Sequence, residues 1–138
     1  MAQSHRLHER IALPRVAVYL KVVAFFLFLG AFSHFASILG LVAGPWAAKP
    51  WYFRVADVVL LFADLVIAWG LWRTKFWSVA AWMAAVVFLQ AIPMLLLLWL
   101  AAPDPRLRAT WYGMLAIHAA MLGAFLLLLP RKIGTSVT

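Results

Sequence analysis

Four long apolar stretches, joined by short polar or aromatic connections, make up most of this chain. They run over residues 16–42, 56–72, 76–100 and 110–129. A helix needs about 20 residues, at a rise of about 1.5 Å each, to cross the roughly 30 Å hydrocarbon core of a bilayer. Apolar residues surround each stretch almost completely, which is typical of helices in contact with lipid. We therefore expect an all-α fold: one integral membrane four-helix bundle over residues 1–138.

Composition supports a membrane class and removes several kinds of chemistry. The chain is 67% apolar and 12% charged, with no cysteine. A soluble domain is about half apolar and a quarter charged. The lack of cysteine excludes thiolate catalysis and iron–sulfur ligation. Since the sequence also contains no nucleophile elbow, no phosphate-binding glycine loop and no metal-ligand spacing, we assign no catalytic residue and no metal site, and do not expect an enzyme.

Basic residues mark the ends of the stretches and predict the orientation of the chain. Eight of the twelve fall on the side that holds both termini, namely Arg6, Arg10, Arg15, Lys21, Arg73, Lys75, Arg131 and Lys132. The opposite side holds Lys49, Arg54, Arg106 and Arg108. The positive-inside rule then places both termini in the cytoplasm of a multi-pass protein of the cell (inner) membrane. Although the net charge is +8, no basic run or patch predicts a nucleic-acid partner.

Five polar side chains interrupt the apolar stretches: His34, Asp57, Asp64, Gln90 and His118. A charge at mid-membrane costs about 2.5 to 3.5 kcal/mol on insertion scales, so an ionisable residue there suggests a functional site. With the orientation above, all five lie in the outer half of the membrane or near its midplane. If they point inward, they form a polar pocket that is reached from the outer side.

Three residues near the outer ends of the helices, Trp51, Arg54 and Trp111, are then expected at the mouth of this pocket. Structural alternatives also apply to the polar residues. Gln90 and the histidines could serve as hydrogen-bonding links between helices. Asp57 could cap the second helix or pair with Arg54. Asp64 has no route to the interface, so it should be protonated, paired or in contact with water.

Two redox ligands suit these residues as hypotheses. His34 and His118 are the only histidines within the spans, so they could ligate a haem b, although their depths differ. A quinone could accept hydrogen bonds from a histidine, with Asp64 exchanging protons nearby. No cofactor is firmly predicted.

Small residues and a proline predict how the helices pack and bend. Gly40 and Gly44 are spaced four apart at the end of the first stretch. Small residues also recur on the fourth stretch, at Ala116, Ala119, Ala120 and Gly123. Such spacing favours close helix packing in membranes. Pro93 predicts a kink that frees a carbonyl near Gln90.

The chain resembles the DoxX-like group of small four-helix membrane proteins. The resemblance rests on residues 26–35 (FLFLGAFSHF), on residues 57–72 (DVVLLFADLVIAWGLW), on a loop with Trp and Pro between them, and on the basic turn that follows. It implies an accessory or assembly subunit that works with redox or quinone-linked partners.

We accordingly expect a small non-catalytic accessory or assembly subunit of a larger membrane complex, in contact with membrane lipid and with a larger membrane protein or other copies of itself. Two alternatives remain open. One is a carrier of a small hydrophobic ligand or of protons that uses the Asp/His/Gln pocket. The other is a haem- or quinone-binding redox protein.

Overall fold

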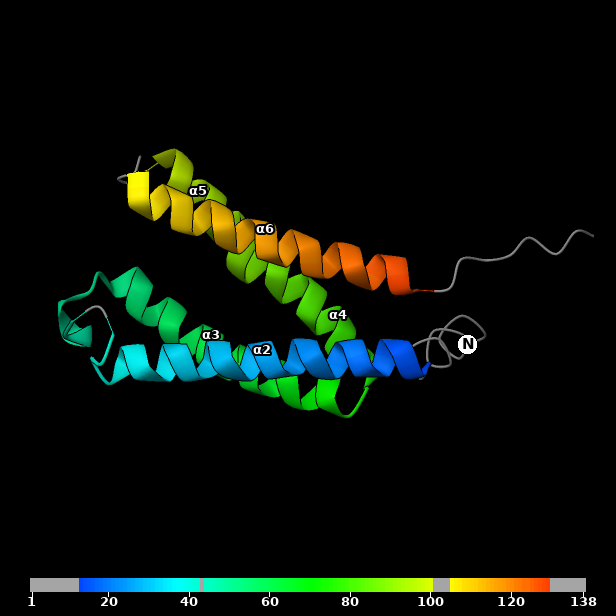
Figure 1. The fold of residues 1–138 in the computed structure, drawn as a ribbon. Helices are drawn as coiled ribbons and strands as arrows, with labels where there is room; N and C mark the ends of the chain where they lie inside the picture. Colours follow the sequence, from blue (N-terminus) through cyan, green and yellow to red (C-terminus); the bar gives the residue numbers. More distant parts are fainter. Residues whose placement is uncertain (1–12, 43, 101–104, 130–138) are drawn as a thin grey trace, which may run out of the picture.

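The structure, a computed structural model, describes residues 13–42, 44–100 and 105–129, and it contains only helices and turns within these ranges (Figure 1). In chain order the elements are α2 (Pro14–Ile38), the 3-10 turn η1 (Trp46–Ala48), α3 (Trp51–Trp72), α4 (Phe76–Ala84), the π-helical η2 (Ala85–Ala91), α5 (Ile92–Leu100) and α6 (Pro105–Leu128). Four helices are long and apolar enough to cross a membrane, because α4, η2 and α5 run on as one. The predicted all-α fold with four such helices is confirmed.

The first helix ends earlier than its apolar stretch. Gly40 has a φ of +73° and terminates α2 in a left-handed turn. Its N–H donates to the Ser37 carbonyl at 3.0 Å, and the Leu41 N–H donates to the Ala36 carbonyl at 2.9 Å. This pair of bonds is the Schellman motif, which favours glycine. Gly40 and Gly44 therefore lie in the connection after α2, and the expectation that they form a helix-packing face is wrong.

The third helix passes Pro93 through a π-helical segment. Proline has no N–H to donate, and its ring crowds the carbonyl four residues earlier, which here belongs to Leu89. The wider π turns of η2 end just before this proline, and they contain Gln90. Figure 1 shows α4 beside α2 and α3, and α5 beside α6, so the third helix runs from one helix pair to the other.

Tight packing is concentrated where α2 begins and α6 ends, which we call the terminal end. The buried apolar residues there come from all four helices and include Val16, Leu20, Val23, Leu71, Val79 and Phe125. Trp82 is 1% exposed and meets Phe125 edge to face, with ring centroids 5.7 Å apart. Tyr19 stacks on the same phenylalanine, and its hydroxyl donates to the Met121 carbonyl. These aromatic contacts attach α6 to the rest of the bundle.

The opposite end, which contains η1, is more open. In Figure 1 the α2–α3 pair and the α5–α6 pair diverge toward this η1 end. At the terminal end, by contrast, glycine allows α3 and α4 to approach closely, because a Cβ on Gly70 would lie 2.5 Å from the Ser78 Cβ. The helix pairs thus lie closer together at the terminal end than at the η1 end.

Candidate functional site

A cavity of about 310 Å³ lies between the two helix pairs. All four long helices line it, and its lining includes four of the five predicted polar residues: His34, Asp64, Gln90 and His118. The rest is apolar and includes Trp82 and the three methionines Met94, Met114 and Met121. Methionine side chains adapt readily to the shape of a ligand. The volume is at the lower end of the range for small-molecule sites, about 300 to 1,000 Å³.

Asp64 is the acidic residue of the cavity lining, and it is buried, with 3% exposure. Its carboxyl group lies against Gly30 on α2, where an added Cβ would be 2.7 Å from Oδ2. Glycine at this position lets the two helices approach around the carboxyl group. Oδ1 has no hydrogen-bond partner among the described residues. A buried carboxyl oxygen without a donor costs free energy unless a ligand or water supplies one.

Two further groups present hydrogen-bond acceptors to the cavity. Gln90 Oε1 is buried and makes no hydrogen bond within the described part of the chain. His118 Nδ1 lies 2.7 Å from the Met114 carbonyl. A carbonyl can only accept, so Nδ1 carries the hydrogen and Nε2 of the neutral ring is left as an acceptor. Asp64 and Gln90 therefore each bring an acceptor without a described donor to one apolar space, which His118 also lines.

His34 connects this cavity to a polar network on its η1 side. Its Nδ1 lies 3.0 Å from Asp57 Oδ1, and the Ser37 hydroxyl donates to Asp57 Oδ2 at 2.6 Å. Lys49 donates to the Ser37 Oγ at 2.5 Å, and its ammonium nitrogen is 3.6 Å from Asp57 Oδ2. The spacing of His34 and Ser37 by one helical turn allows both to reach the same carboxylate.

The role expected for Asp57 needs correction. The N-cap of α3 is Pro50, and no side chain caps this helix. Asp57 pairs with Lys49 and His34, and not with Arg54, among the residues that the structure describes. Sequence reasoning missed Lys49 because nothing in the loop indicated which basic residue would turn back over α2.

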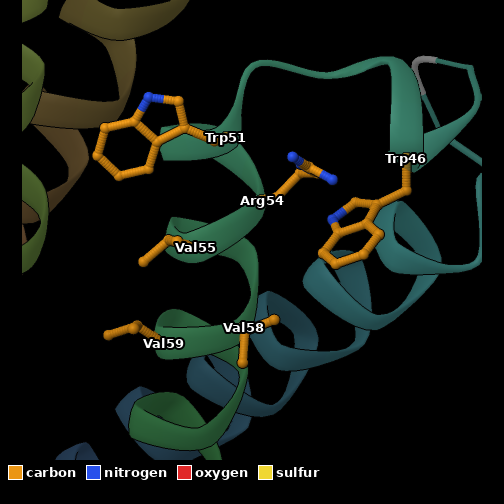
Figure 2. Close-up of a pocket in the computed structure, with 6 residues that line it drawn as sticks. All are labelled: Trp46, Trp51, Arg54, Val55, Val58 and Val59. Atoms are coloured by element: carbon orange, nitrogen blue, oxygen red, sulfur yellow. The ribbon is translucent and has the colours of Figure 1, made fainter.

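Trp51 and Arg54 lie at a different place from the one expected. They line a second cavity of about 350 Å³ on α3, together with Trp46, Val55, Val58 and Val59 (Figure 2). Trp111 is half-buried on α6 and belongs to the lining of neither cavity. None of these three residues therefore lines the polar cavity.

The small residues of α6 do not pack against other helices in the part of the chain that the structure describes. Ala116, Ala119 and Ala120 are exposed, and a Cβ on Gly123 would meet no atom within 4 Å. The face they form is open to lipid or to another protein.

The volume of the cavity argues against a haem, and the hydrogen bonds of its histidines argue against a quinone. Both histidines line the cavity, but a volume of about 310 Å³ favours a small ring over a haem macrocycle. The Nδ1 hydrogens of His34 and His118 are already directed at Asp57 and at the Met114 carbonyl. Neutral histidines therefore have no hydrogen left to donate to a quinone carbonyl. Within the described residues, no group of three or more His, Asp or Glu side chains could hold a metal ion.

Comparison of the chain with protein-family models, with curated proteins and with solved structures finds no match. A functional assignment therefore has to rest on the residues of the two cavities and on their chemistry.

We predict that Asp57→Asn lowers the free energy of unfolding by about 2 kcal/mol, because the amide nitrogen cannot accept from Ser37 or His34. Lys49→Met should cost less in the Asp57→Asn background than in the wild type, with a coupling of about 1 kcal/mol. Unfolding in mild detergent, followed by circular dichroism, measures these values. Lys75→Met, at the other end of α3, is the control and should be additive with Asp57→Asn. Additive costs for Lys49→Met would contradict the network.

Proposed function

We propose that this chain is a multi-pass protein of the cell (inner) membrane, with both termini in the cytoplasm, that binds a small hydrophobic molecule through hydrogen-bond donors on that molecule. The four apolar helices support insertion into a membrane. The excess of Lys and Arg at the terminal end supports the orientation. With this orientation, the polar residues of the cavity lie in the outer half of the bilayer or near its midplane.

The observation that carries this proposal is the mismatch between acceptors and donors in the cavity. Asp64 Oδ1 and Gln90 Oε1 are buried without partners in the described chain. Each such group costs about 1 to 3 kcal/mol when it is left unsatisfied. A ligand with hydroxyl groups would satisfy them, while its ring or chain contacts the methionines and Trp82. A quinol has this chemistry, because it joins two hydroxyl donors to an apolar ring.

The network beside the cavity suits proton exchange with such a ligand. His34 lies between the cavity and Asp57, and the hydrogen bonds continue through Ser37 to Lys49 in the η1 loop. Histidine and carboxylate side chains accept and return protons near neutral pH. A proton-coupled carrier uses the same residues, whereas a haem b between His34 and His118 fits the cavity volume less well.

A second function, compatible with the first, is that of an accessory or assembly subunit of a larger membrane complex. The observation that favours it is the open small-residue face of α6 at Ala116, Ala120 and Gly123. Small residues let another transmembrane helix approach closely. The resemblance to DoxX-like proteins implies the same role with redox or quinone-linked partners. Other copies of this chain are the alternative partner.

We expect decyl-ubiquinol to bind the detergent-solubilised protein at least tenfold more tightly than its oxidised quinone, because its hydroxyl groups satisfy buried acceptors that each cost about 1 to 3 kcal/mol without a donor. Isothermal titration calorimetry measures both affinities. Asp64→Asn should remove most of this preference without unfolding the protein.

Two glycine-to-alanine variants test whether the ligand needs access to the Asp64 carboxyl group. Gly30→Ala places a methyl group against the Asp64 carboxyl and should weaken quinol binding about tenfold. Gly113→Ala is the control, because a Cβ on Gly113 meets no atom within 4 Å. Equal affinities for quinol and quinone, together with equal effects of the two alanine variants, would contradict the proposed ligand site.

For the accessory role, we predict that Gly123→Leu leaves the thermal stability of the purified chain unchanged but abolishes co-purification of a stoichiometric partner from native membranes. The reason is that the added side chain fills only space outside the chain. Mass spectrometry of the purified fraction identifies what is lost. Val66→Phe enlarges a 56%-exposed residue on α3 and serves as the control. Retention of the partner by Gly123→Leu would rule out this face.

A further inference from the structure

The second cavity lies over the first turns of α3 and is separate from the polar cavity. Figure 2 shows Arg54 between two tryptophans, with Trp46 on η1 on one side and Trp51 at the start of α3 on the other. Val55, Val58 and Val59 continue the lining along the helix. One end of this groove is therefore cationic and aromatic, and the other end is apolar.

The cationic end contains two buried N–H groups without acceptors. Arg54 Nε and Trp46 Nε1 make no hydrogen bond to any residue that the structure describes. The Arg54 guanidinium carbon lies 5.7 Å from the centre of the Trp46 ring, so the two donors belong to one cluster. Buried donors of this kind are normally satisfied, because an unsatisfied one has lost its hydrogen bonds to water without replacement. Since neither donor finds an acceptor among the described residues, both are available to a ligand in the groove.

Among the residues that the structure describes, the charge at this end also lacks a counterpart. Asp57, the nearest acidic residue along α3, is already engaged by His34, Ser37 and Lys49. The first turn of α3 contains no acidic residue, and no side chain caps its N–H groups. The positive end of the helix dipole therefore adds to the Arg54 charge. An anion is the acceptor that this end of the groove favours.

The apolar end decides which anion fits. Arg54 lies three residues inside the start of α3, or about 5 Å along the helix axis. Tryptophans on both sides match the aromatic belt at the membrane–water interface, where lipid phosphates lie. Val55 and Val59 are 52% and 43% exposed, and they extend from there toward the hydrocarbon. An acyl chain can follow these valines while the phosphate of the same molecule contacts Arg54.

From this geometry we propose that the groove binds one phospholipid of the outer leaflet, with the phosphodiester accepting hydrogen bonds from Arg54 and Trp46 and an acyl chain lying along Val55, Val58 and Val59. Arginine suits this role, because its planar guanidinium offers several donors in a geometry that matches phosphate oxygens. The lipid would hold η1 against the start of α3, beside the Lys49–Asp57 pair.

The test measures binding of phosphatidylglycerol to the full-length, delipidated protein in detergent by native mass spectrometry. Arg54→Gln should weaken binding about ten- to a hundredfold, and Trp46→Phe, which keeps the ring but removes the donor, about five- to tenfold. Diacylglycerol, which has the same chains without the phosphate, should bind at least tenfold more weakly than phosphatidylglycerol.

Arg73→Gln is the matched control, because its guanidinium carbon lies 4.3 Å from the Trp69 ring centre at the opposite end of α3. It removes the same charge and should change the affinity less than twofold. Equal losses in Arg73→Gln and Arg54→Gln, or no loss in Arg54→Gln, would overturn the proposal. Displacement of the lipid by inorganic phosphate at equal concentration would also overturn it in favour of a free-anion site. If Arg54→Gln does not fold, the affinity of Trp46→Phe decides in the same way.

Discussion

A polar atom in hydrocarbon has no water to bind, so it needs a partner within the protein or on a ligand. Asp57 meets this requirement within the chain, through His34, Ser37 and Lys49. Asp64 and Gln90 do not meet it among the described residues. The Asp57 network near η1 is therefore structural, whereas the unsatisfied acceptors of Asp64 and Gln90 favour a ligand in the cavity. The same reasoning applies to Arg54 and Trp46 at the second groove.

The helix arrangement makes this contrast possible. Trp82 and Phe125 fill the terminal end, while the two helix pairs diverge toward η1 (Figure 1). Gly30 brings α2 close to the Asp64 carboxyl group, and the π-helical η2 places Gln90 at the cavity lining. π-helical segments occur frequently at functional sites, where they change the direction of a side chain. The packed terminal end therefore borders the polar cavity, and Trp82 belongs to both.

The sequence predicted the helices better than it predicted their contacts. The long apolar stretches predicted the number of helices. The cost of burying polar groups in a membrane pointed to the polar residues of the spans, and four of them, His34, Asp64, Gln90 and His118, line one cavity. The end of α2 was misplaced because Leu41 and Val42 are apolar, although Gly40 already turns the chain. The positions of Arg54, Trp51 and Lys49 were missed for another reason. Helices that are apolar all round do not reveal which side faces a neighbour, so rotation about the axis stays undetermined.

The central claim is that the cavity between the helix pairs is accessible to ligands from the outer side of the membrane, and cysteine accessibility tests it most directly. The chain has no cysteine, so each introduced thiol is unique. Met94→Cys lies at the cavity, whereas Phe88→Cys replaces a residue that is 66% exposed and outside the lining. A membrane-impermeant maleimide applied to the outside of intact cells should label Met94→Cys and leave Phe88→Cys unlabelled. No labelling of Met94→Cys, or equal labelling of both, would contradict the account.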